Sequence, residues 1–306
     1  MNPSNPQNDV LDAVFSVTWK HRLRFTSNAF HQTSPLTALI EELQPKKLLV
    51  VIDEGLALAN ESILKSVEDW QSQLSVSNCA PIVVTGGEQA KNDFSVVKKV
   101  LETINSNRIC RSSCVIAVGG GAVLDAVGYA TSIAHRGLHL IRMPSTTLSA
   151  CDSGVGVKNG INYFGKKNFT GVFDPPYAVV NDLSLLTTLD DRHWRAGLSE
   201  AIKVALVLDG CFFETIESYV SQLVKRDSDA IEAIVRHSAT LHFQHITEGG
   251  DPFERLDARP LDFGHWAAHK LEQLSNYEIT HGEAVSIGLA IDLRCSALLE
   301  IGRAHV

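Results

Sequence analysis

The segment Cys114–Asp125 reads CVIAVGGGAVLD, and this stretch decides the fold class. Its first five residues are apolar, which predicts a strand over Cys114–Gly119 that is buried on both faces of a sheet. Three glycines follow, and a helical apolar pattern then begins. Glycine lets a backbone approach a phosphate closely, and a helix N-terminus directs N–H groups at an anion. The pattern is neither the GxGxxG fingerprint nor a P-loop, so a tight turn without a ligand remains the alternative interpretation.

The same alternation of strands and helices extends to both sides of this segment. Strands are predicted at Lys47–Asp53, Pro81–Gly86, Leu140–Ser145 and Tyr177–Asp182, and helices at Glu61–Leu74 and Asp93–Ile104. This order is typical of a parallel sheet covered by helices on both faces. The stretch Asp152–Gly171, rich in Gly, Lys and Asn, has too little apolar periodicity for a regular element. We predict a functional loop there.

Helical periodicity dominates after Thr188. The predicted helices are Arg195–Val207, Cys211–Val224, Ser228–Gln244, His265–Leu274 and a last one from His281 to the C-terminus. We therefore predict an α/β domain over residues 1–185 and a helical domain over residues 186–306.

Composition excludes several classes of function. The formal net charge is −8, whereas a nucleic-acid partner needs a basic face. The six cysteines form no CxxC pair, which predicts small buried hydrophobes in a reducing compartment. The N-terminus lacks a signal pattern, and four glycines and Asp125 interrupt the longest apolar stretch, 113–134. We expect no membrane span and a cytoplasmic protein.

The helical half carries a set of carboxylate and histidine side chains at suggestive spacing. Glu200 and Lys203 lie on one helical face, His265 and His269 are separated by four residues, and His281 begins the last predicted helix. One Glu and two His from three helices would suit Zn²⁺ and leave positions open for substrate oxygens. The alternative is that His265 and His269 are partly buried residues held by hydrogen bonds.

Taken together, these segments resemble the 3-dehydroquinate synthase family of sugar-phosphate cyclases. The matching motifs are Gly119-Gly120-Gly121 with Asp125, the loop PSTTLSACDSGVGVKNGINY at 144–163, Lys167-Asn168, GLSEAIK at 197–203, DFGHWAAH at 262–269 and HGEAVSIGL at 281–289. They occur in the family's order and cover most of the chain. The resemblance implies a Rossmann-like NAD-binding domain followed by an all-helical metal-binding domain.

The resemblance also implies roles for individual residues. Glu200, His265 and His281 would bind one divalent metal, Zn or Co. The NAD contacts would come from Asp53, Glu88, Lys91, Gly120, Gly121, Asp125, Thr146, Thr147, Asp152, Lys167 and Thr188. The substrate phosphate would be held by Lys158, Asn168 and His269, together with Arg136 from the second subunit of a homodimer. The catalytic group would be Lys203, which meets a substrate hydroxyl, with Asp152, His269 and Asp262.

The reaction that the resemblance implies explains these residue types. NAD oxidises a ring hydroxyl to a ketone, which acidifies the neighbouring C–H. Phosphate leaves, hydride returns, the ring opens, and an intramolecular aldol reaction closes a carbocycle. The metal polarises the oxygen being oxidised, and basic groups stabilise the leaving phosphate.

Departures from the family pattern bear on the substrate. Counted back from His265 without gaps, Asp251 and Glu254 match the family's acidic pair. In that register the family's basic and amide residues are replaced by Gln244, Ala258 and Asp262. Two lost cations and one new anion disfavour a substrate carboxylate.

We therefore predict that sedoheptulose 7-phosphate is preferred over 3-deoxy-arabino-heptulosonate 7-phosphate, as in the 2-epi-5-epi-valiolone synthase branch. Arg259, one residue from the position of the family's arginine, leaves the register open. The family pattern continues beyond Val306, so we expect an incomplete second domain. The alternatives are a 3-dehydroquinate synthase of the shikimate pathway, an iron-type alcohol or glycerol dehydrogenase, and an inactive paralogue that retains NAD.

Overall fold

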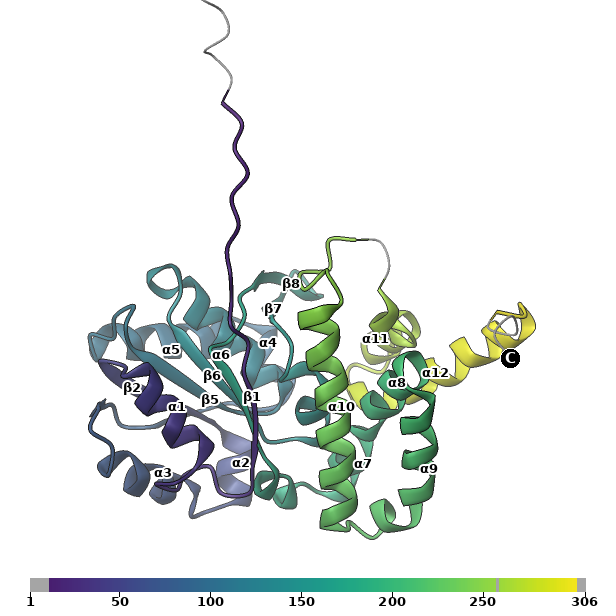
Figure 1. Ribbon diagram of the computed structural model, residues 1–306, viewed down its shortest axis with the longest axis horizontal. Coiled ribbons are helices and arrows are strands. Elements are labelled where there is room, and N and C mark those ends of the chain that lie inside the picture. Colours follow the sequence, from purple (N-terminus) through teal and green to yellow (C-terminus); the bar gives the residue numbers. More distant parts are fainter. Residues whose placement is uncertain (1–10, 257–258, 302–306) are drawn as a thin grey trace, which may run out of the picture.

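The computed structural model describes residues 11–256 and 259–301 and confirms the predicted fold class (Figure 1). The strands of the main sheet are β1 (Leu23–Thr26), β2 (Lys47–Asp53), β3 (Ser77–Asn78), β4 (Ile82–Val84), β5 (Cys114–Gly119), β6 (His139–Pro144) and β9 (Ala178–Asp182). They are parallel and follow the order β1-β9-β6-β5-β2-β3, with β4 also paired to β2. Strands β2 and β5 lie near the centre of the sheet. They are almost wholly buried because helices cover both faces of the sheet.

Helices cover the two faces of this sheet. They are α1 (Pro35–Leu43), α2 (Glu54–Ala59), α3 (Ile63–Ser72), α4 (Gln89–Asn92), α5 (Ser95–Ser106) and α6 (Gly121–Ile133). One apolar cluster packs α5 and α6 against alternate side chains of β2 and β5. A second cluster packs α1 and α3 against the opposite face, around the buried Trp70. The sheet therefore holds the turns after β2, β5 and β6 at one rigid edge.

A helical part follows the sheet. Its helices are α7 (Asp191–Ala196), α8 (Leu198–Leu208), α9 (Gly210–Val224), α10 (Ser228–Glu248), α11 (His265–Leu274) and α12 (His281–Leu298). The shorter turns are η2 (Ala134–Arg136), η3 (Ser149–Ser153), η4 (Leu183–Thr188) and η5 (Pro260–Asp262). Figure 1 shows α10 beside the sheet and α12, in yellow, extending away from the body. The predicted boundary at residue 185 falls inside η4 and stays a prediction.

Two sequence predictions about local structure are wrong. The expected loop 152–171 contains the antiparallel hairpin of β7 (Lys158–Tyr163) and β8 (Lys166–Phe173). The hairpin leaves no apolar pattern in the sequence, because two of its buried side chains are polar. Asn159 and Asn162 are buried, and their side-chain amides form hydrogen bonds. The predicted helix 195–207 is two helices, broken at Gly197, where a Cβ would lie 2.2 Å from a backbone nitrogen of the loop after β6.

The prediction of buried cysteines is partly wrong. Cys79, Cys114 and Cys151 are buried, whereas Cys211 and Cys295 are exposed, and Cys110 is half-buried. All six are free thiols. In the described part of the chain, no helix has both the length and the apolar character needed to cross a membrane.

Candidate active site

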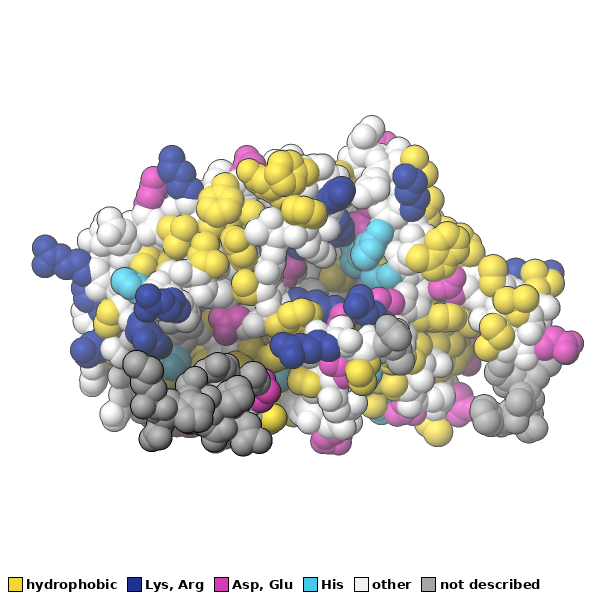
Figure 2. All heavy atoms as spheres, turned by 90° about the horizontal axis from the view of Figure 1, so that it is seen from above, with side chains coloured by type: hydrophobic (Ala, Val, Ile, Leu, Met, Phe, Trp, Pro, Cys, Tyr) yellow, Lys and Arg dark blue, Asp and Glu magenta, His cyan; other side chains and the backbone are white. Residues whose placement is uncertain are grey.

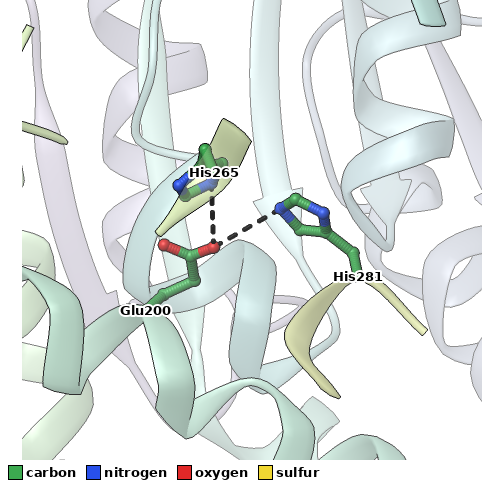
Figure 3. A group of neighbouring side chains, drawn as sticks. All are labelled: Glu200, His265 and His281. Carbon is green, nitrogen blue, oxygen red and sulfur yellow. Dashed lines mark ion pairs between the residues drawn. The ribbon is translucent and has the colours of Figure 1, made fainter. Parts of the chain in front are cut away.

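Three side chains from three helices converge where the helical part meets the sheet. Glu200 lies in the first turn of α8, and His265 and His281 are the first residues of α11 and α12. Each histidine directs its Nε2 at Glu200 Oε1, at 3.6 Å from His265 and 3.5 Å from His281 (Figure 3). The structure thus brings together the three residues predicted as metal ligands.

The spacing of these atoms suits a metal site better than a set of hydrogen bonds. A hydrogen bond from nitrogen to oxygen spans about 2.7–3.2 Å. Two ligands of one tetrahedral zinc, each at about 2.0–2.1 Å from the ion, lie about 3.3 Å apart. The observed separations of 3.5 and 3.6 Å are closer to the ligand spacing. The three ligand atoms lie within 4.8 Å of one another, so a single cation fits among them.

A buried lysine and a second carboxylate support this group. Lys203 Nζ lies 2.5 Å from Glu200 Oε2 and 2.6 Å from Asp152 Oδ2. Burial opposes the charge on Lys203, but the two carboxylates prevail and raise the pKa of its ammonium above the usual range. Burial also opposes the charge on Asp152, yet Lys203 and His242 hold the pKa of Asp152 well below its ordinary value. Lys203 and Asp152 therefore stay ionised at neutral pH.

The surroundings of the three histidines shift their pKa values in different directions. Burial lowers the pKa of His265. Burial and, to a smaller extent, the charge of Lys167 lower the pKa of His269 to about 4. Burial opposes the charge on His281, but the nearby carboxylates of Glu200 and Glu272 raise the pKa of this imidazole. A neutral imidazole is the form that binds a metal. The ring of His269 stacks 5.9 Å from that of His281, so His269 flanks the three ligands.

The glycine turn lies where α6 begins. Gly120 is the N-cap of α6 and offers no side chain to its free N–H groups, and its own N–H donates to Asp53 Oδ2 at 3.4 Å. A Cβ on Gly121 would meet Ser153 Oγ at 2.6 Å. The hydroxyls of Ser153 and Thr147 are buried and have no hydrogen-bond partner among the described residues. An uncapped helix N-terminus with the unpaired hydroxyl of Ser153 beside it fits a phosphate-bearing group such as NAD.

Other residues predicted around the nucleotide form a polar network. Lys91 Nζ lies 2.6 Å from Asp125 Oδ2 and also donates to Asn168 Oδ1. Glu88 accepts a hydrogen bond of 3.0 Å from Asn162. Lys91 is only 3% exposed, so its ammonium lies inside the protein, where it links α4 and α6 to β8. The predicted contacts of these residues with NAD and phosphate stay predictions.

Asp53, Thr146 and Thr188 also have local partners. Asp53 caps α2 by accepting a backbone N–H bond of 2.8 Å, a role that is common for an acidic residue after a strand. The hydroxyl of Thr146 contacts Ser149 Oγ at 2.8 Å, and that of Thr188 donates to a backbone carbonyl of η4. Their contacts with NAD likewise stay predictions.

Three further predicted residues are exposed at the surface. Lys158, with 55% of its side chain exposed, pairs at 2.5 Å with Glu254, which follows α10. Asp262 is exposed in η5, which packs against α8. Figure 2 shows histidine, basic and acidic side chains around a recess between the sheet and the helical part. Arg136 is exposed before β6, at the opposite end of that strand from Thr146 and about 20 Å away along it.

Comparison with known proteins places the chain in a family. A model described as 3-dehydroquinate synthase N-terminal matches residues 81–196, and one described as 3-dehydroquinate synthase C-terminal matches residues 197–305. A 3-dehydroquinate synthase from Bartonella bacilliformis is 34% identical over 277 residues, which cover 89% of this chain and 69% of the relative. The chain belongs to the 3-dehydroquinate synthase family.

Proteins with other names are also similar to this 3-dehydroquinate synthase family member. A 2-epi-valiolone synthase from Actinosynnema mirum is 32% identical over 255 residues, 83% of this chain and 65% of the relative. The structure of ValA, a 2-epi-5-epi-valiolone synthase from Streptomyces hygroscopicus with NAD⁺ and Zn²⁺ bound, aligns with a TM-score of 0.79 and 27% identity. That alignment covers 92% of this chain and 75% of ValA. The chain spans between 58% and 70% of the length of its curated relatives.

Several polar residues of this 3-dehydroquinate synthase family member were not predicted from its sequence. His242 Nε2 lies 3.2 Å from Asp152 Oδ1, and the fully buried Arg142 donates to three backbone carbonyls of the segment before and at the start of β7. Nothing in their local sequence marks them. Glu272 does carry a signal, because it follows His265 by seven residues on the same face of one helix.

Proposed function

We propose that the chain is an NAD- and divalent-metal-dependent cyclase that converts a heptulose 7-phosphate into a carbocycle with loss of phosphate. The observation that carries this proposal is the convergence of Glu200, His265 and His281 at ligand spacing. A carboxylate oxygen and two imidazole nitrogens are a donor set that Zn²⁺ or Co²⁺ accepts. The uncapped turn at Gly120 and Gly121 supports a site for NAD. ValA binds both NAD⁺ and Zn²⁺.

When bound, the nucleotide would supply a reversible hydride acceptor, and the ion would supply a Lewis acid. The residues of the chain would position the sugar. Lys203 is held between two carboxylates, and we infer that its remaining N–H donates to a substrate hydroxyl. Asp152 keeps that ammonium charged and fixed in direction. His269, neutral at pH 7, would contribute a hydrogen bond without a charge.

The phosphate of the substrate needs cations that the chain supplies from two directions. Lys158 has an exposed ammonium, which a phosphate would draw from Glu254. Arg136 precedes β6, whereas the loop that packs against Gly197 of the helical part follows β6, about 20 Å away along the strand. We therefore propose a homodimer in which Arg136 serves the site of the second copy. Size-exclusion chromatography with light scattering would test the dimer, and a strictly monomeric protein with full activity would refute it.

For the substrate we propose sedoheptulose 7-phosphate over 3-deoxy-arabino-heptulosonate 7-phosphate. Gln244 and Asp262 are exposed, whereas Ala258 lies outside the described residues. Arg259 makes its contact with the backbone carbonyl of Glu254, at 3.4 Å. An exposed carboxylate at Asp262 would repel a substrate carboxylate and would accept a hydrogen bond from a neutral hydroxymethyl group.

Phosphate release from the two sugars, measured with and without a chelator, tests this proposal. We expect release from sedoheptulose 7-phosphate that the chelator abolishes. Asp262→Asn should narrow the preference between the two sugars, since it removes the repelling charge. Preference of the wild-type protein for the carboxylated sugar would support a 3-dehydroquinate synthase instead. Net reduction of NAD⁺ by simple alcohols would support a dehydrogenase, and metal and NAD binding without release would support an inactive paralogue.

A further inference from the structure

A second group of ligand-type side chains adjoins the metal ligands and shares one residue with them. Atoms of His269, Glu272 and His281 lie within 4.8 Å of one another. However, Lys167 Nζ lies 2.6 Å from Glu272 Oε1. An ammonium therefore already neutralises the carboxylate that a second cation would need. The group is better described as a chain of polar contacts that runs from Lys167 through Glu272 to His281.

Glu272 is the centre of this chain of contacts. It is 2% exposed, and its two carboxylate oxygens have different partners on opposite sides. Oε1 accepts from Lys167 Nζ, and Oε2 lies 3.0 Å from His281 Nδ1. A buried carboxylate is costly unless both of its oxygens are bonded. Burial raises the pKa of Glu272. The hydrogen bond from His281 and the charge of Lys167 outweigh this effect and bring the pKa down to about 2.

We propose that Glu272 is a positioning residue that fixes His281 for metal binding and, through Lys167, couples metal binding to docking of the β7–β8 hairpin. This inference rests on the metal ligands of the proposed function. With Nδ1–H donating to Glu272, the lone pair of His281 Nε2 is left free and faces Glu200. Carboxylate partners of this kind orient a ligating imidazole and raise its basicity.

The coupling follows from where the contacts lie. Lys167 belongs to β8, while Glu272 and His281 belong to α11 and α12. The hairpin meets the helical part at a second ion pair, Lys158 with Glu254. A cation at Nε2 would polarise the imidazole and strengthen its bond to Glu272. Because coupling between two binding events is reciprocal, the ion should order the hairpin by as much as the docked hairpin favours the ion.

Zinc affinity of the full chain, measured by competition with a chromophoric chelator, tests the positioning role. Glu272→Gln should bind Zn²⁺ about 10–100-fold more weakly than wild type. The matched control is Glu283→Gln. Glu283 lies two residues from His281 and pairs with Arg192 at 2.7 Å, but it makes no bond to the His281 ring. This control should lose thermal stability and keep its zinc affinity. The absorbance of the Co²⁺-loaded form should change only in Glu272→Gln.

Hydrogen exchange tests the coupling. Adding Zn²⁺ to the metal-free wild type should slow amide exchange in residues 158–173, and this effect should be lost in Glu272→Gln and in Lys167→Met. Equal zinc affinity and equal protection in wild type and Glu272→Gln would overturn the inference. Wild-type protein that binds no zinc at the three ligands, with Glu200→Ala as the reference, would overturn the proposed function as well. If Glu272→Gln does not fold, Lys167→Met alone decides, because its unchanged metal-dependent protection would refute the coupling.

Discussion

Replacing Lys203 with methionine would test the buried charge network beneath the proposed metal ligands. Lys203 is 2% exposed, and its ammonium lies 2.6 Å from an Asp152 oxygen and 2.5 Å from a Glu200 oxygen. Methionine keeps the length and apolar stem of the side chain but removes the charge. In the metal-free protein, the two carboxylates would then face each other without a cation. We expect a large loss of stability.

The size of the loss can be worked from these contacts. At an effective dielectric constant of about 20, each contact corresponds to a Coulomb attraction of about 6–7 kcal/mol. Desolvation of the three buried charges offsets most of this attraction. Breaking a buried ion pair by removing one partner usually costs about 3–5 kcal/mol, because the remaining charge is left uncompensated. For a protein of this size that is a fall in melting temperature of roughly 10 °C.

Thermal unfolding of the metal-free proteins measures this loss, and an exposed lysine provides the control. Lys98 pairs with Glu102 at 3.8 Å, and their side chains are 71% and 67% exposed. Lys98→Met should leave the melting temperature unchanged, because solvent screens such a pair. Adding Asp152→Asn to Lys203→Met should restore part of the stability by removing one of the two repelling carboxylates. Equal melting temperatures for Lys203→Met and Lys98→Met would refute the reasoning.

Three further predictions concern groups outside the metal ligands. Gly86→Ala places a Cβ 2.2 Å from Asp53 Oδ1 and should displace this cap of α2. Denaturant unfolding should then show a free energy of unfolding lower by about 1 kcal/mol. The control Gly210→Ala, whose Cβ would have nothing within 4 Å, should leave the free energy of unfolding unchanged. Arg142→Met should lower the free energy of unfolding by about 3 kcal/mol or more, because several backbone carbonyls lose a charged donor. Amide exchange should also become faster in the segment 153–158, which Arg142 holds. Hydrogen bonds from neighbouring serines lower the pKa of Cys110 to about 7, so its alkylation by iodoacetamide should rise as pH increases through about 7, and a midpoint near the ordinary thiol value of about 8.5 would contradict this.

Local sequence patterns predicted the elements whose buried side chains are apolar. Lys47–Asp53 and Cys114–Gly119 were predicted at their observed limits, because strands at the centre of a parallel sheet are continuous apolar runs. The β7–β8 hairpin was missed, because Asn159 and Asn162 are buried through hydrogen bonds and leave no periodic signal. The break at Gly197 was missed because it reflects close packing against a distant loop.

The sequence by itself determined the parallel-sheet class, the order of the motifs and the three residues proposed to bind metal, because these are features of local periodicity and residue type. Only the tertiary structure decided the partners of those residues. Lys203 meets Asp152 across 51 positions of sequence, and Lys167 meets Glu272 across 105. Such pairings join buried charges from separate elements. They depend on how helices and strands pack in space, which local residue patterns do not encode.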